Sequence, residues 1–138
     1  MSPYILAPLL AWLLAQILKY FIRSLHDKNL KSYNLLYTSG GMPSAHTAMV
    51  IALAATIGVR EGLGSSLFAV SAALALITAY DSMHVRRATG EHGAALTELL
   101  KTSGSKTVLH QATGHRPLEV LGGAVLGAVV AAAVLSLN

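Results

Sequence analysis

The chain has 138 residues and no cysteine, and ten basic residues against six acidic ones leave a net charge of +4. Hydrophobic residues make up 54% of it, charged residues only 12%, and the mean hydropathy is +0.57. Soluble domains carry about 25% charged residues, so much of this surface is expected to face lipid. The length allows one domain over residues 1–138. The missing cysteines exclude disulfides and thiolate metal sites, and the scarcity of aromatics among the basic residues argues against nucleic-acid binding.

Apolar stretches predict an all-α, integral membrane helical bundle of about four transmembrane helices plus short amphipathic helices. They cover residues 3–22, 45–59, 67–85 and 118–137. Crossing a membrane takes about 20 apolar residues, and the first stretch reaches that length if Lys19 extends its amine to the interface. Because it lacks a positive leader and a small-residue cleavage site, we interpret it as a retained helix. Residues 91–100 suit an amphipathic helix that lies on the membrane or caps the bundle.

The last apolar stretch contains two glycines, Gly123 and Gly127, spaced four residues apart. This spacing lets a second helix approach closely. We therefore expect tight helix packing on this glycine face, which also suits a homodimer.

Basic residues are distributed unequally between the two ends of the four-span arrangement. Nine lie at one end, namely Lys19, Arg23, Lys28, Lys31, Arg86, Arg87, Lys101, Lys106 and Arg116. Only Arg60 lies at the other end. Cytoplasmic loops are enriched in lysine and arginine, so the basic end is predicted to be cytoplasmic and both termini outside. Three segments with unusual polar residues, 39–48, 81–87 and 114–119, then meet on the cytoplasmic face.

The first of these segments combines Gly41, Pro43, Ser44 and His46 directly before an apolar helix. A proline and a serine are favoured at a helix start, and a helix N-terminus attracts anions. His46 can exchange a proton near neutral pH. The segment therefore fits a phosphate cradle with a general acid, or simply a capped helix with an interfacial histidine.

His115 and Glu119 are four residues apart and share one face of a helix. A carboxylate beside an imidazole sets its tautomer and raises its basicity, and such a histidine can act as a nucleophile or base. The alternative is a surface pair, which membrane depth makes costly for Glu119.

Asp81, Arg86 and Arg87 form the third segment. A carboxylate in an apolar span is a functional candidate, and arginines can hold phosphate oxygens. Adjacent helical residues diverge by about 100°, so one arginine is expected in the site and the other at lipid headgroups. Metal ligation by Asp81, His84, Glu91, His92, His115 and Glu119 was the competing interpretation; the lack of a compact ligand motif and the nearby cations argue against it, so we expect no metal and no cofactor.

Three blocks together resemble a known family. They read Gly-Gly-Met-Pro-Ser-Ala-His-Thr-Ala at 40–48, Tyr-Asp-Ser-Met-His-Val-Arg-Arg at 80–87, and Gly-His-Arg-Pro-Leu-Glu-Val-Leu-Gly-Gly-Ala-Val-Leu-Gly at 114–127. These blocks and their order resemble those of the divergent branch of the type 2 phosphatidic acid phosphatase superfamily. That superfamily is related to lipid phosphatases and vanadium haloperoxidases. The likeness extends from about residue 5 to residue 135.

The resemblance implies a role for each matching residue. His115 would attack phosphorus, Glu119 would orient it, and His46 would protonate the leaving group. Ser44 and the backbone near Gly41 would help to hold phosphate.

Two further phosphate-binding roles depart from the superfamily pattern. Arg86 or Arg87 would supply the arginine of the later block, although the pair lies about 28 residues before His115. Lys31 would supply the lysine of the first block, where Thr38 and Ser39 stand in place of arginine and proline. Asp81 would support this region.

Together these features predict a metal-independent lipid-phosphate phosphatase with a phosphohistidine intermediate. Its substrate would be a lipid phosphomonoester or pyrophosphate at the cytoplasmic face. A non-catalytic membrane protein that binds anionic headgroups or a partner is the alternative, and a lipid phosphotransferase is a third reading.

Overall fold

A computed structural model of the chain describes residues 1–27, 41–104, 107 and 114–137. It contains five helices, which are α1 (Pro3–Asp27), α2 (Ala45–Glu61), α3 (Ser66–Met83), α4 (Val85–Thr102) and α5 (Pro117–Ser136). The described residues include no strand, so the all-α prediction is confirmed.

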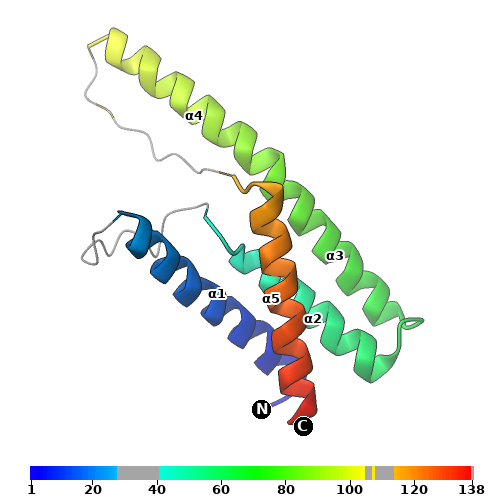
Figure 1. Ribbon diagram of the computed structural model, residues 1–138. Helices are drawn as coiled ribbons and strands as arrows, with labels where there is room; N and C mark the ends of the chain where they lie inside the picture. Colours follow the sequence, from blue (N-terminus) through cyan, green and yellow to red (C-terminus); the bar gives the residue numbers. More distant parts are fainter. Residues whose placement is uncertain (28–40, 105–106, 108–113, 138) are drawn as a thin grey trace.

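Helix α2 lies at the centre of the bundle, in contact with α1, α3 and α5. The chain runs alternately up and down, and both termini lie at the end of the bundle where α2 turns into α3 (Figure 1). The opposite end gathers the C-terminal half of α1, the start of α2, the junction of α3 with α4, and the start of α5. The three polar segments singled out in the sequence therefore share one end, as expected.

Three helical stretches are long and apolar enough to cross a membrane: Pro3–Leu25, Ser66–Thr102 and Pro117–Ser136. Helix α2 has 17 residues, about 26 Å of helix, slightly less than the ~30 Å hydrocarbon core. Of the four predicted spans, α2 is therefore the one whose helix is too short to cross the hydrocarbon core. Instead it is the helix that the others enclose.

Small residues allow the helices around α2 to approach closely. The core combines Ala7, Ala11 and Ala15 of α1 with Ala48 and Ala52 of α2, and with Val130, Ala131 and Val134 of α5. At the end that carries the termini, the Tyr4 hydroxyl donates a hydrogen bond to the Glu61 carboxylate. Because alanine adds little side-chain bulk, the backbones supply much of the packing surface.

The two glycines of α5 face α2 of the same chain. A Cβ atom at Gly123 would overlap the carbonyl oxygen of Ser44, and one at Gly127 would overlap that of Ala48. The expected tight packing is therefore present within one chain. The glycine face is covered by α2 of the same chain, and the homodimer stays a prediction.

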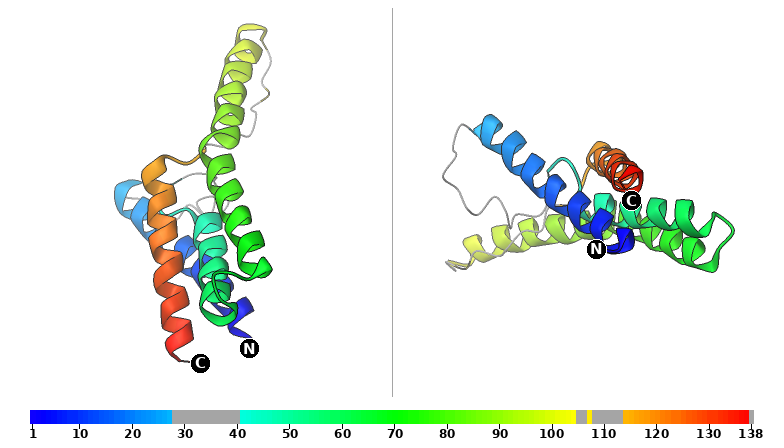
Figure 2. Two further views of the ribbon diagram at one scale, coloured as in Figure 1. Left: turned by 90° about the vertical axis from the view of Figure 1, so that its right-hand side faces the viewer. Right: turned by 90° about the horizontal axis from the view of Figure 1, so that it is seen from below.

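Helix α4 continues directly from α3, with only His84 between them, and leaves the bundle (Figures 1 and 2). Among the described helices it contacts α3 alone. The amphipathic helix predicted for residues 91–100 is thus longer than expected, and it does not cap the described bundle. Leu96 and Leu99 remain exposed, which leaves its predicted membrane contact open.

Candidate functional site

The segment before α5 is anchored to the junction of α3 and α4. The backbone N–H of His115 donates to the carbonyl of Ser82 at 2.9 Å. Gly114 lies so close to the backbone of Arg87 that a Cβ atom would fall 2.6 Å from its Cα. A glycine at this position is therefore what allows His115 to approach α4.

His115 and Glu119 form a close pair at the start of α5. The His115 Nδ1 and Glu119 Oε2 atoms are 2.7 Å apart, and the histidine is buried. The same carboxylate oxygen accepts the backbone N–H of Arg116 at 3.3 Å. Pro117 begins the helix, and a carboxylate in the first turn interacts favourably with the helix dipole. The local sequence thus fixes the carboxylate, which in turn holds the imidazole.

The start of α2 is attached to this pair through the backbone. Ser44 N–H donates to the carbonyl oxygen of Glu119 at 2.9 Å. The Ser44 hydroxyl caps α2, accepting the N–H of Thr47 and lying 2.9 Å from the Thr47 hydroxyl. Ser44 is completely buried. Ser44 thus has a structural role in joining α2 to α5, and the phosphate contact of its hydroxyl stays a prediction.

His46 is exposed at the second residue of α2. The charges that act on it belong to Arg86, Lys19, His115 and Asp81. Both predicted catalytic histidines and one predicted arginine therefore lie at the same end of the bundle, within range of one another's charge. Gly41, four residues before α2, has a φ of 90°, which its lack of a side chain permits.

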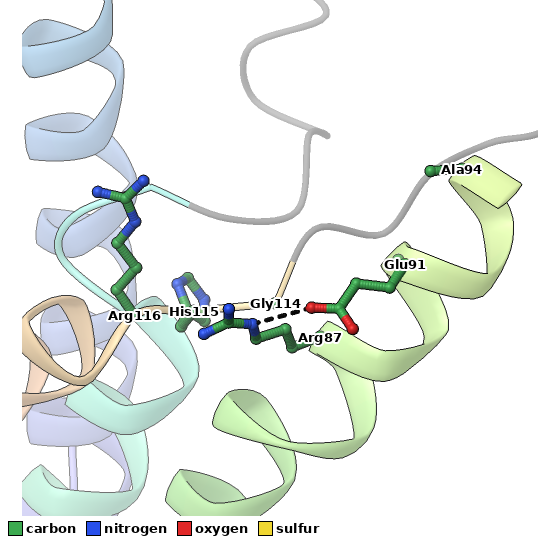
Figure 3. A pocket seen from close by; sticks show the side chains of 7 residues that line it. Arg87, Glu91, Ala94, Gly114, His115 and Arg116 are labelled. Atoms are coloured by element: carbon green, nitrogen blue, oxygen red, sulfur yellow. Dashed lines mark hydrogen bonds and ion pairs between the residues drawn. The ribbon is translucent and has the colours of Figure 1, made fainter.

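The two adjacent arginines have different surroundings. Arg86 Nε donates to Asp81 Oδ2 at 2.7 Å, and Arg87 Nε donates to Glu91 Oε1 at 3.2 Å. Figure 3 shows Arg87 extending from α4 toward His115, while Arg116 points away. Arg86 lies near His46 and Arg87 lies near His115. This differs from the expectation that one arginine lies in the site and the other at the lipid headgroups.

A pocket of about 360 Å³ lies between α4 and the start of α5 (Figure 3). Arg87, Glu91, Gly114, His115 and Arg116 line it, together with Gly90 and Ala94. His46 is not among its lining residues. The pocket therefore lies on the side of His115 that faces α4.

A second, almost wholly apolar groove of about 520 Å³ runs between α1 and α5. It is lined by Leu18, Ile22, Met42, Pro43, Leu118, Leu121, Gly122, Val125, Leu126 and Val129. Met42 and Pro43 stand between Gly41 and Ser44 in the chain, and Leu118 precedes Glu119. The groove therefore begins beside the polar residues of the site.

Lys31, a predicted phosphate-binding residue, lies outside the described part of the chain. Lys19 lies near the site and was not predicted to do so. Lys19, expected to extend to the interface, is instead buried with 7% of its surface exposed. The sequence held a signal for this, because Lys19 continues the four-residue spacing of Ala7, Ala11 and Ala15, the face that α1 buries.

The competing metal interpretation needed several ligands in one place. Within the described residues, no three histidine, aspartate or glutamate side chains are gathered so that they could hold a metal ion. His84 stacks on Tyr80 with 4.2 Å between ring centroids.

Comparison with known proteins agrees with the three blocks and the helical bundle. Residues 1–130 match the model of the family described as "Divergent PAP2 family". The chain is also similar to a protein of Bacillus subtilis (strain 168) named "Uncharacterized membrane protein YuiD". The two are 34% identical over 139 aligned positions, covering 89% of this chain and 87% of the relative. No solved structure matches. With three helices long and apolar enough to span a membrane, the chain is an integral membrane protein that belongs to the divergent PAP2 family.

Proposed function

We propose that the protein is a metal-independent lipid-phosphate phosphatase that works through a phosphohistidine at His115. The observation that carries the proposal is the 2.7 Å contact between His115 Nδ1 and Glu119 Oε2 at a buried position. A hydrogen bond from Nδ1–H to the carboxylate leaves Nε2 unprotonated, with its lone pair available for attack.

The proposed reaction has two steps. In the first, Nε2 of His115 forms a bond to phosphorus while the bond from phosphorus to the lipid oxygen breaks, and His46 gives its proton to that oxygen. In the second, His46 takes a proton from water, whose oxygen attacks phosphorus and displaces His115. Free phosphate leaves, and both histidines return to their starting states. Glu119 stays ionised and stabilises the positive charge that His115 carries in the intermediate.

Arg86 and Arg87 supply positive charge for the phosphate oxygens in this proposal. Arg86 acts electrostatically on His46, and Arg87 lines the pocket of His115. Each is held by one carboxylate through Nε, and a guanidinium has further N–H groups for other acceptors. Asp81 is thus proposed to orient Arg86 and not to contact phosphate.

The apolar groove supports a lipid as the substrate. Along α5 it runs from Leu118 to Val129, twelve residues or about 16 Å of helix, which is about half of a ~30 Å hydrocarbon core. One leaflet has the same depth. We assign the groove to one hydrocarbon chain of the lipid whose phosphate group lies at the site.

The site is proposed to face the cytoplasm, with both termini outside. The support is the charge distribution: of the seven lysines and arginines within the described residues, all but Arg60 belong to the end that carries the site. This is the arrangement that the positive-inside rule favours.

The test is phosphate release from lipid phosphomonoesters and pyrophosphates by purified protein in the presence of EDTA. We expect His115→Ala to lower kcat about 1000-fold or more, because the nucleophile is lost. His46→Ala should slow release most for substrates with poor leaving groups. A water-soluble short-chain ester should be a poorer substrate than its long-chain counterpart. Equal release by wild type and His115→Ala would contradict the mechanism, and product analysis with an added alcohol would identify a phosphotransferase.

A non-catalytic protein that binds anionic headgroups is the second candidate. The ion pairs of Arg86 with Asp81 and of Arg87 with Glu91 favour it, because paired arginines offset less charge on a transition state. Binding of lipid phosphates that His115→Ala leaves unchanged, with no release of phosphate under any condition, would support this candidate.

A further inference from the structure

Lys19 is a buried cation in a place where the sequence predicted an exposed one. It exposes 7% of its surface and lies on the face of α1 that also buries Ala7, Ala11 and Ala15. A lysine on this face points into the bundle instead of toward lipid or the headgroups. The neighbours of its ammonium group therefore decide its role.

Three elements surround the Lys19 side chain. Its stem packs on Gly41, where a Cβ atom would lie 3.6 Å from Lys19 Cγ and 3.8 Å from Cδ. The negative charge of Glu119 acts on Lys19, and the positive charge of Lys19 acts on His46. Lys19 thus lies between the segment before α2 and the start of α5, among the residues of the proposed active site.

Lys19 differs from Arg86 and Arg87 in having no bonded partner in the described part of the chain. Among the described residues it makes no hydrogen bond and no ion pair, whereas Arg86 is bonded to Asp81 and Arg87 to Glu91. Glu119 is the carboxylate whose charge acts on Lys19, and its Oε2 is already bonded to His115 and to the N–H of Arg116. An ammonium at the end of a largely buried side chain, with three unused donors, can bind an anionic acceptor that reaches the site.

We propose that Lys19 is the lysine that binds the phosphate group at this site, the role that the sequence pattern assigned to Lys31. The ligand is a tetrahedral phosphate, either free or on a lipid headgroup. A phosphate oxygen would accept from the ammonium in a charge-assisted hydrogen bond. That this ligand is a substrate rests on the proposed function. That the ligand binds at Lys19 does not, because binding requires no turnover.

The test measures phosphate affinity directly, by isothermal titration of purified protein with inorganic phosphate. Lys19→Met keeps the length of the stem and removes the charge, and we expect it to raise Kd at least tenfold. Lys19→Arg should stay within about threefold of wild type. Arg60→Met removes one positive charge from the opposite end of the bundle and should leave Kd unchanged. A Kd for Lys19→Met within twofold of wild type, or no phosphate binding by wild type, would overturn the proposal.

A second measurement needs no variant, in case Lys19→Met does not fold. Wild-type protein is reductively methylated with and without inorganic phosphate, and the modified lysines are quantified by mass spectrometry. Phosphate should slow methylation of Lys19 at least threefold and leave Lys101, which is exposed at the end of α4, unchanged. Equal rates at Lys19 with and without phosphate would reject its role.

Two further arms separate this inference from the proposed function and identify the source of the phosphate. His115→Ala cannot form a phosphohistidine, yet it should still lose phosphate affinity when Lys19→Met is added. If no form of the protein releases phosphate but this dependence on Lys19 remains, the catalytic proposal fails and the binding site stands. Vesicles that contain a lipid phosphomonoester should displace inorganic phosphate if the headgroup is the ligand, and should have no effect if free phosphate is.

Discussion

Glu119 has two bonding partners that depend on different properties of its side chain. Its carboxylate accepts from the Arg116 N–H, which caps α5, and contacts Nδ1 of His115, which orients the imidazole. Helix capping needs only an acceptor oxygen, whereas support of a charged imidazole needs the negative charge. A substitution that separates the two properties therefore separates folding from chemistry.

Glu119→Gln makes this separation. The amide oxygen can still accept from the Arg116 N–H, so we expect the thermal unfolding temperature in detergent to change little. The proposed phosphohistidine loses its counter-charge, and phosphate release should fall about 100-fold or more. Release rates and melting curves of the same preparations check both expectations.

Glu119→Asp is the matched control for that experiment. It keeps the charge but shortens the side chain by one methylene, so activity should lie between those of wild type and Glu119→Gln. If Glu119→Gln releases phosphate at the wild-type rate, the carboxylate does not support the nucleophile.

Ser44 is expected to act on stability and not on phosphate. Its buried hydroxyl caps α2, so Ser44→Ala should lower the free energy of unfolding by about 1 kcal/mol. The backbone bond from Ser44 N–H to the Glu119 carbonyl remains, and kcat/KM should fall less than about fivefold, which is below the effect expected when a hydrogen bond to a charged group is lost. Chemical denaturation and steady-state kinetics measure the two effects.

Ser65 provides a control with the same cap at the other end of the bundle. Its hydroxyl caps α3 by accepting the N–H of Phe68 at 3.1 Å. Ser65→Ala should therefore cost a similar free energy without any effect on kinetics. A much larger loss of kcat/KM for Ser44→Ala than for Ser65→Ala would show that the Ser44 hydroxyl does serve the phosphate.

At the scale of the helices, the contact of α5 with α2 is made by backbone. Gly127→Ala would place a methyl group against the carbonyl of Ala48, and neither helix can move away without losing its other contacts. We expect a loss of about 1–3 kcal/mol in the free energy of unfolding. Titration with a denaturing detergent, followed by circular dichroism, measures it.

Gly122 offers the matched control on the same helix. A Cβ atom there would meet the Cε atom of Met42 at 2.9 Å, the end of a side chain that can rotate away. Gly122→Ala should therefore cost less than Gly127→Ala. Equal effects of the two substitutions would mean that the α2–α5 approach is looser than described.

At the scale of the whole molecule, the bundle places the termini at one end and the site at the other. The lack of native cysteines makes labelling of single cysteines direct. Ser2→Cys and Gly64→Cys, at the end with the termini, should react with a membrane-impermeant maleimide on intact cells. Thr102→Cys should react only after permeabilisation, because we propose that its end is cytoplasmic.

The labelling pattern separates two errors. Reaction of Thr102→Cys alone on intact cells would reverse the proposed orientation and leave the bundle intact. Reaction of Ser2→Cys and Thr102→Cys from the same side would contradict the arrangement of the helices.

The sequence by itself predicted an all-α membrane bundle, the meeting of three polar segments at one end, and the proximity of His115 to Glu119. The first two follow from local properties, namely apolar length and the alternation of spans. His115 lies outside α5, two residues before Pro117, and the pair is close because Glu119 in the first turn reaches back to the residues that precede the helix.

Only the tertiary structure decided which side chains are buried between helices and which face the site. Whether Lys19 extends to the headgroups or turns inward depends on which face of α1 meets α2. The alanines of α1 pack in the core, so the face that carries Lys19 is the buried one. Burial of Ser44 and the covered glycines of α5 depend equally on the α2–α5 contact. These are properties of a face and its neighbour, and residues far apart in the chain create them, so spacing along the sequence could not assign them.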